Sequence, residues 1–193
     1  MKDEAARADR ETQDPYARQS VISAAAELLT DAGLIGESDA LLEAELARSH
    51  SPYYFMLGLA LNAKERGDKA SAVGWAEKAY AAAQGPATRL QWGARYVSLL
   101  IELTPQDAAR IEKAAAQVIA ELEPVPETFY ERNQRSLERL GRNLAKWGQD
   151  PVHRAAAQHL RAEMAGVCAK VPAADPARAN CEGALKPPAT KKA

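Results

Sequence analysis

The sequence is poor in the residues that build β-sheets. Valine and isoleucine together number 13 of 193 residues, and the aromatic residues number 11. Alanine, the strongest helix former, occurs 42 times, and leucine occurs 19 times. Because a sheet would need many more β-branched and aromatic side chains, this composition predicts an all-α protein.

The sequence also has no excess of positive or negative charge and no long hydrophobic run. The chain has 25 Lys and Arg against 26 Asp and Glu, which argues against a general nucleic-acid binder. No apolar run reaches the roughly 18 residues of a membrane-spanning helix, so we expect no membrane insertion. The charged start at Lys2, Asp3 and Glu4 does not resemble a secretory signal. We therefore expect either a cytosolic chain as it stands or an excised part of a longer protein.

Motifs for catalysis or metal binding are lacking as well. His153 and His159 are six residues apart and fall on different faces of a helix, so they cannot chelate one ion together. Glu121 and Glu123, two residues apart, also point in different directions. The sequence carries none of the common nucleotide, zinc or serine-hydrolase motifs. We predict no catalytic residues, no metal and no cofactor.

Proline and glycine divide the chain into helices. Asp175-Pro176 has the pattern of a helix start, and Gly33 and Gly67 follow amphipathic runs in the way helix ends do. The helices predicted this way lie near 17–32, 37–49, 52–66, 69–84, 87–103, 105–122, 127–147 and 151–169, with a short one after Asp175. We expect residues 1–15 to be flexible, 16–185 to form one helical repeat domain, and 186–193 to be a disordered tail.

The glycines and prolines that separate the predicted helices recur at a regular interval. Gly33 and Gly67 are 34 residues apart, and so are Pro52 and Pro86. This helix–turn–helix period, with small residues such as Ala72 at packing positions, resembles that of tetratricopeptide repeats. The resemblance implies a TPR-like α-α superhelix of about four helix pairs, in which the atypical pair at 127–169 is a terminal cap.

A superhelix of this kind has a concave face that commonly binds extended peptides. The repeat register assigns to that face Glu27, Asp31, Tyr54, Leu61, Lys64, Glu65, Leu90, Ala94 and Val97. The surface is mixed in character and indicates a protein or peptide partner without specifying one. We therefore predict a non-catalytic protein-interaction scaffold.

A basic stripe is predicted on the seventh helix. Its members are spaced by three or four residues and are Arg132, Arg135, Arg139, Arg142 and Lys146. The stripe is either an ordinary solvated helix face or a surface for an acidic partner.

The two cysteines lie near the C-terminus. Cys168 and Cys181 flank a segment rich in proline and alanine, which favours a disulfide that holds the last helix as a C-terminal cap; two independent thiols are the alternative. A disulfide would imply an oxidising compartment. A redox protein that cycles this pair is a competing function, although only Lys170 lies nearby to lower a thiol pKa.

Three segments together resemble one bacterial family. They are Gly85–Gly93, the turn 65–68, and the stretch from Cys168 to Cys181 with its Ala-Ala-Asp-Pro-Ala-Arg core. They are similar to the helical C-terminal region of exported proteins that carry an N-terminal thioredoxin-like domain. The resemblance spans roughly 12–185 and implies a periplasmic or otherwise exported location, with an adjacent thioredoxin-like domain as partner. It transfers no redox residue, since the C-x-x-C motif is absent. A cytosolic helical-repeat regulator is the remaining alternative.

Overall fold

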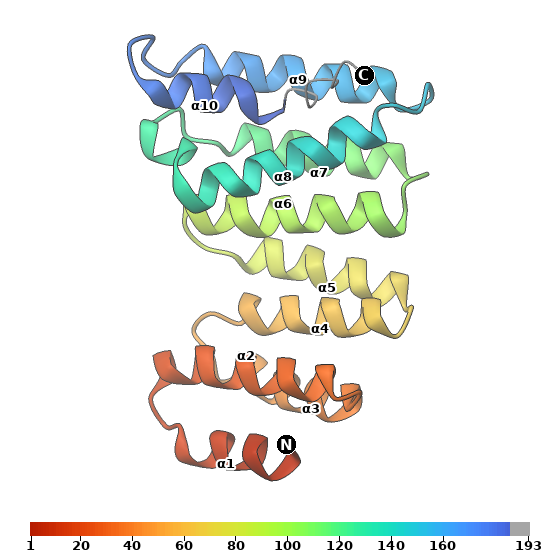
Figure 1. Ribbon diagram of the computed structural model, residues 1–193, viewed down its shortest axis with the longest axis vertical. Helices are drawn as coiled ribbons and strands as arrows, with labels where there is room; N and C mark the ends of the chain where they lie inside the picture. The colour runs from red at the N-terminus through yellow and green to blue at the C-terminus, as the bar shows by residue number, and fades with distance from the viewer. Residues whose placement is uncertain (186–193) are drawn as a thin grey trace, which may run out of the picture. The chain divides into compact units, whose positions relative to one another are not determined.

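The computed structural model describes residues 1–185, which form ten α-helices and one short 3-10 helix without any strand (Figure 1). The helices are α1 (Lys2–Glu11), α2 (Pro15–Asp31), α3 (Ile35–Leu46), α4 (Tyr53–Glu65), α5 (Lys69–Ala82), α6 (Pro86–Leu103), α7 (Ala108–Ala120), η1 (Pro126–Phe129), α8 (Glu131–Trp147), α9 (Arg154–Cys168) and α10 (Pro176–Ala184). The all-α prediction is confirmed. The predicted tail, 186–193, lies outside the described residues.

Local sequence explains most helix ends. The Asp175 side chain accepts a hydrogen bond from the Ala177 N–H, so α10 begins where the Asp-Pro pair predicted. Gly33 and Gly67 each adopt φ of 76°, the left-handed conformation that ends α2 and α4. The start predicted for α7 at Pro105 was wrong, because Asp107 caps the helix instead by accepting from the Arg110 N–H.

The chain divides into two compact units, Met1–Ala83 and Gln84 onward, where the sequence predicted one domain over 16–185. In the first unit, each helix from α1 to α5 packs on its neighbours in the sequence, and α2 also packs on α4. Its core contains Ile22, Leu42, Phe55 and Leu59. This unit is a stack of successive hairpins, in keeping with the 34-residue period.

The prediction of a flexible segment at 1–15 was wrong, because α1 forms there and packs on α2 through Ala5. The buried Arg18 side chain holds this helix in place by hydrogen bonds. Its guanidinium donates to the carbonyl oxygens of Asp9 and Thr12 at 2.6 and 2.7 Å, and it also pairs with Glu45 on α3. The charged composition of the segment gave no sign of these contacts, because they depend on how the Arg18 side chain of α2 is placed against α1 and α3.

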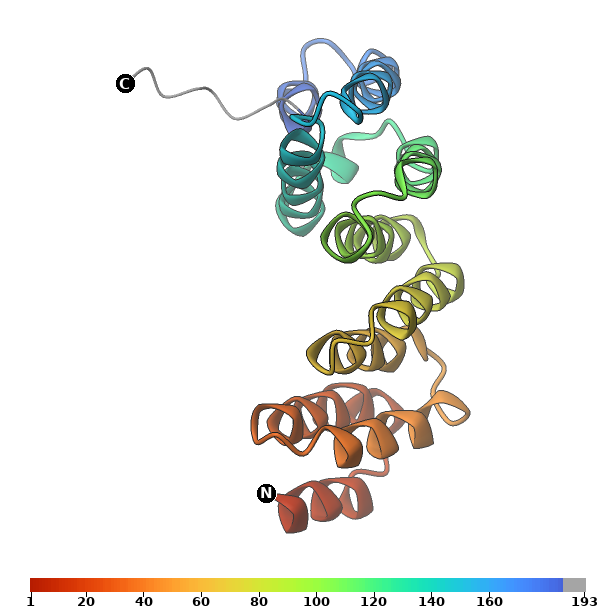
Figure 2. The same ribbon diagram turned by 90° about the vertical axis from the view of Figure 1, so that its right-hand side faces the viewer.

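The second unit is arranged differently. α6 packs on α7, but α8 packs chiefly on α6 and α9 chiefly on α7, so α8 and α9 form no close hairpin of their own. In Figure 2, α6 and α8 lie in one layer of this unit and α7 and α9 in the other. α10 packs against α8, α9 and η1.

The C-terminal end of this unit is held at two close contacts. The sulfur atoms of Cys168 on α9 and Cys181 on α10 lie at disulfide distance, their Cα atoms are 5.6 Å apart, and both residues are buried. At the C-terminal end of α10, the Ala184 carbonyl approaches Gly141 of α8 so closely that a β-carbon on Gly141 would collide with it. α10 is thus fixed to α9 and to α8.

Candidate functional site

In the first unit, the residues assigned to a binding face lie at the surface. Tyr54 and Leu61 are seven residues apart and so point from one side of α4, with Leu57 between them. Leu61 is 42% exposed, and Tyr54 and Leu57 are half-buried. We call Tyr54, Leu57 and Leu61 the α4 row.

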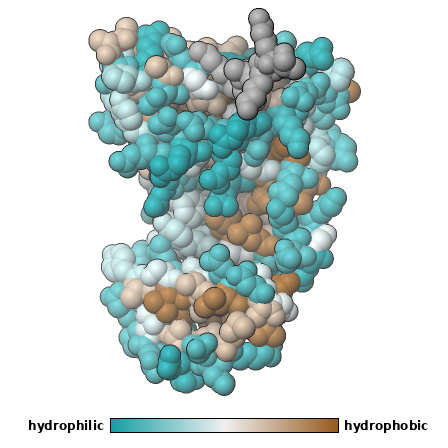
Figure 3. All heavy atoms as spheres, viewed as in Figure 1, coloured by the Kyte–Doolittle hydropathy of each residue, from teal (hydrophilic) through white to brown (hydrophobic). Residues whose placement is uncertain are grey.

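Charged residues lie around this row. Lys64 and Glu65 extend it at the end of α4, and Glu27 and Asp31 are exposed on α2, which packs on α4. Figure 3 shows hydrophobic residues at the surface over the first unit, among hydrophilic ones. The first unit therefore carries an apolar surface with a charged border.

In the second unit, the assignment to the binding face was wrong for Leu90, Ala94 and Val97. All three are buried, and Val97 is completely inaccessible. The reason is that α7 and α8 both pack on α6 and cover most of its surface. A register taken from hairpins stacked as in the first unit does not anticipate α8 in this position.

The basic stripe of α8 is exposed along its whole length, at Arg132, Arg135, Arg139, Arg142 and Lys146. Arg95 of α6 lies near this stripe, and burial together with the charge of Arg139 lowers the pKa of Arg95. Glu138 offsets part of the charge, with a carboxylate oxygen 4.0 Å from Arg142. A solvated face and an acidic-partner surface both remain consistent with this arrangement.

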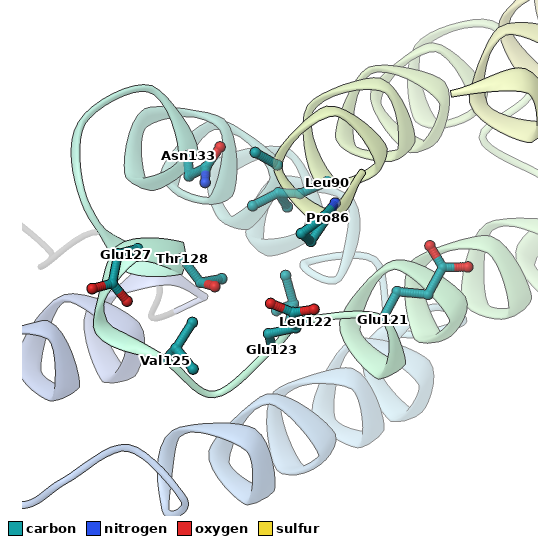
Figure 4. Close-up of a pocket in the computed structure, with 10 residues that line it drawn as sticks. Pro86, Leu90, Glu121, Leu122, Glu123, Val125, Glu127, Thr128 and Asn133 are labelled. Carbon is teal, nitrogen blue, oxygen red and sulfur yellow. The ribbon is translucent and has the colours of Figure 1, made fainter. Parts of the chain in front are cut away.

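A pocket of about 110 Å³ lies in the second unit among the first turn of α6, the end of α7, η1 and the start of α8 (Figure 4). We call it the α6–α8 pocket. Its walls are mainly apolar, and Figure 4 shows Pro86 and Leu90 on one side with Leu122 and Val125 across from them. The remaining lining residues are Ala87, Glu121, Glu123, Glu127, Thr128 and Asn133.

The polar groups of the pocket differ in how well they are paired. The Arg89 guanidinium donates two hydrogen bonds to the Glu121 carboxylate, at 2.9 and 2.7 Å, and neutralises it. Within residues 1–185, Glu123 and Glu127 have no ion-pair partner, and both are exposed. Thr128 is only 9% exposed, and in the same part of the chain its hydroxyl has no hydrogen-bond partner.

A wider hollow of about 350 Å³ adjoins the pocket and shares Glu127 and Asn133 with it. Tyr130, Glu131 and Arg132 complete its lining. Sequence reasoning missed both spaces, because their residues come from several segments without a common motif. The available signal was the group of glutamates at 121, 123 and 127 beside a proline-rich loop.

The histidines have packing and surface roles. His153 stacks on Trp147 with ring centroids 4.4 Å apart, and His159 Nδ1 lies 2.9 Å from the Glu112 carboxylate. Over the described residues, no three His, Cys, Asp or Glu side chains come together in a way that could hold a metal ion. Nor is any helix there long and apolar enough to span a membrane.

Comparison with known proteins adds no relative. The chain matches no protein-family model, and no curated protein or solved structure is significantly similar to it. The resemblance to the helical region of exported thioredoxin-like proteins therefore remains an expectation that rests on the segments quoted above.

Proposed function

We propose that this chain is a non-catalytic scaffold that binds segments of a protein partner. The observation that carries the proposal is the α4 row, which contains Tyr54 and Leu61, two positions assigned to a TPR-like concave face, and which exposes Leu61 to solvent. Apolar surface with a polar border is typical of protein-interaction sites. On α2, Val21 and the exposed Leu28 add further apolar surface to the same unit.

The cysteine pair supports an oxidising, exported location and a structural role for the bond. Cys168 and Cys181 are 1% and 0% exposed, whereas a cysteine that exchanges disulfides must be reached by another thiolate. We therefore rank the scaffold above a redox protein that uses these cysteines, and above a cytosolic regulator. A thioredoxin-like domain is the partner that the resemblance implies.

The test is selection of peptides from a random display library, followed by titration of the enriched peptides by calorimetry. We expect micromolar binding that falls at least tenfold in Leu61→Glu, because the new charge would lie in the apolar contact. Val152→Glu is the matched control, since Val152 is also an exposed aliphatic residue but lies in the second unit. Failure to enrich any peptide, or equal binding by both variants, would contradict the proposed surface.

The non-catalytic part is tested separately by reduction of insulin with dithiothreitol as electron donor. We expect no acceleration above the uncatalysed rate. Turnover that disappears in Cys168→Ser would establish the redox alternative instead.

A further inference from the structure

We propose that the α6–α8 pocket binds a basic side chain, arginine in preference to lysine, from an extended segment of the protein partner. This inference deepens the scaffold function proposed above and rests on it. It names the chemistry that one surface of the scaffold recognises.

The size of the pocket points to a single side chain. At about 110 Å³ it is well below the roughly 300–1,000 Å³ of sites that hold whole small molecules. Its walls of Pro86, Leu90, Leu122 and Val125 can contact methylene groups. Arginine and lysine bury their aliphatic stems along such surfaces while the charged end stays in a polar region.

The polar groups require a donor at the end of that side chain. Thr128 is 9% exposed and lines the pocket with a hydroxyl that has no hydrogen-bond partner within 1–185, and Glu123 and Glu127 present two carboxylates without ion pairs in the same residues. A guanidinium has five N–H donors in a planar fork and no acceptor, so it can serve several acceptors at once. Because Arg89 already neutralises Glu121, the remaining charge at the mouth is that of Glu123 and Glu127.

Other occupants fit less well. An anion would meet the two carboxylates, and the first residue of α6 is Pro86, which has no N–H to offer it. A purely apolar side chain would cover the Thr128 hydroxyl without giving it a hydrogen bond, which is unfavourable. The adjoining hollow of about 350 Å³ gives the residues next to the basic side chain room to continue.

The test uses four capped pentapeptides, acetyl-Ala-Ala-X-Ala-Ala-amide, with arginine, lysine, citrulline or glutamate at X. Citrulline has nearly the shape of arginine but no charge. We expect the arginine peptide to shift the amide NMR signals of Leu122, Val125 and Thr128 in the full chain, with an affinity at least tenfold above citrulline. Equal binding of arginine and citrulline, tighter binding of glutamate, or shifts confined to other residues would overturn the proposal.

Two pairs of variants make the test specific. Glu123→Gln with Glu127→Gln should lower the affinity for the arginine peptide at least tenfold and leave citrulline unchanged. Asp3→Asn with Glu11→Gln removes the same charge from α1, in the first unit, and should change neither. If Leu61→Glu abolishes selected peptides while the arginine peptide never binds, the pocket proposal fails and the scaffold stands. If the arginine peptide binds but no library peptide depends on Leu61, the α4 surface fails instead.

Discussion

Both units of the molecule have polar contacts between helices, and the second unit has in addition a cysteine pair at disulfide distance. In the first unit, polar side chains join the three successive helices α2, α3 and α4. Asn62 of α4 donates to the Ser38 hydroxyl and the Asp39 carboxylate of α3, and Thr30 of α2 donates to the Asn62 carbonyl, all at 2.8 Å. Arg18 joins α2 to α3 through Glu45.

In the second unit, the described contacts at the C-terminal end depend on close backbone approach and on the cysteine pair. Gly141 lets α10 touch α8, and Cys168 lies beside Cys181. We therefore expect the first unit to depend most on its buried polar contacts and the last helix of the second unit to depend most on a Cys168–Cys181 disulfide. Four changes test this contrast, from the largest expected effect to the smallest.

The largest effect is expected from Glu45→Ala. Glu45 is 2% exposed and its carboxylate raises the pKa of Arg18 above the ordinary value, so its removal leaves the buried guanidinium with Asp9 and the Thr12 carbonyl as its remaining partners. Breaking a buried pair on one side costs at most about 3–5 kcal/mol, and the Asp9 carboxylate retains part of that stabilisation. Urea unfolding followed by hydrogen exchange should locate the loss in α1 to α3.

Glu37→Ala is the control for Glu45→Ala, because the Lys2–Glu37 pair is exposed and screened by solvent, so its loss should change stability little. Similar losses in both variants would show that the buried network does not hold the first unit together.

The second effect concerns the Cys168–Cys181 bond, which spans 13 residues. In the chain-entropy model, a closed loop of about this length stabilises the folded state by about 3 kcal/mol. Reduction should therefore lower the free energy of unfolding of the second unit by about that amount and increase hydrogen exchange in α10. Cys168→Ser combined with Cys181→Ser should be insensitive to reductant. Two free thiols in the intact mass of protein from an oxidising compartment would contradict the bond.

The third effect is that of Gly141→Ala. The added methyl would collide with the Ala184 carbonyl, and overpacking of this kind costs about 1–3 kcal/mol. We expect a lower Tm and faster exchange in α10. Gly166→Ala is the matched control, because no atom lies within 4 Å of a β-carbon there and alanine favours a helix by about 0.5–1 kcal/mol. A Tm that rises in both variants would rule out the close contact.

The smallest effect is a dependence on pH. The hydrogen bond to Glu112, and secondarily the charge of Glu163, raise the pKa of His159. A raised pKa means that the folded state favours protonated His159, so this stabilisation is complete below the ordinary pKa of about 6.5 and is lost as the pH rises through the folded value. The Tm difference between the wild type and His159→Gln should therefore shrink from pH 5.5 to pH 8.5. A constant difference would contradict the assigned contact.

The sequence predicted the helices well and the contacts between them less well. Gly33 and Gly67 act through their backbone conformation and Asp175 through a hydrogen bond from its near neighbour Ala177, so the helix ends that they set could be predicted from local sequence. The burial of Val97 depends on the packing of α8 against α6, and the order of α1 depends on the placement of the Arg18 side chain, neither of which a local pattern specifies. The α6–α8 pocket was missed for the same reason, although Leu61 was correctly expected at the surface.

The hydrogen bonds that join Asn62 to Thr30, Ser38 and Asp39 also affect whether this repeat array could be lengthened by duplication of a helix pair. A repeat protein can lengthen by copying one unit, provided that each copy presents the surface its neighbour needs. One period of 34 residues after Thr30, Ser38 and Asn62 stand Lys64, Ala72 and Tyr96, which cannot rebuild the same hydrogen bonds. An inserted copy of 53–83 would therefore bring an asparagine without its partners. These hydrogen bonds fix the order of the first two helix pairs in the array, so that neither pair could replace the other.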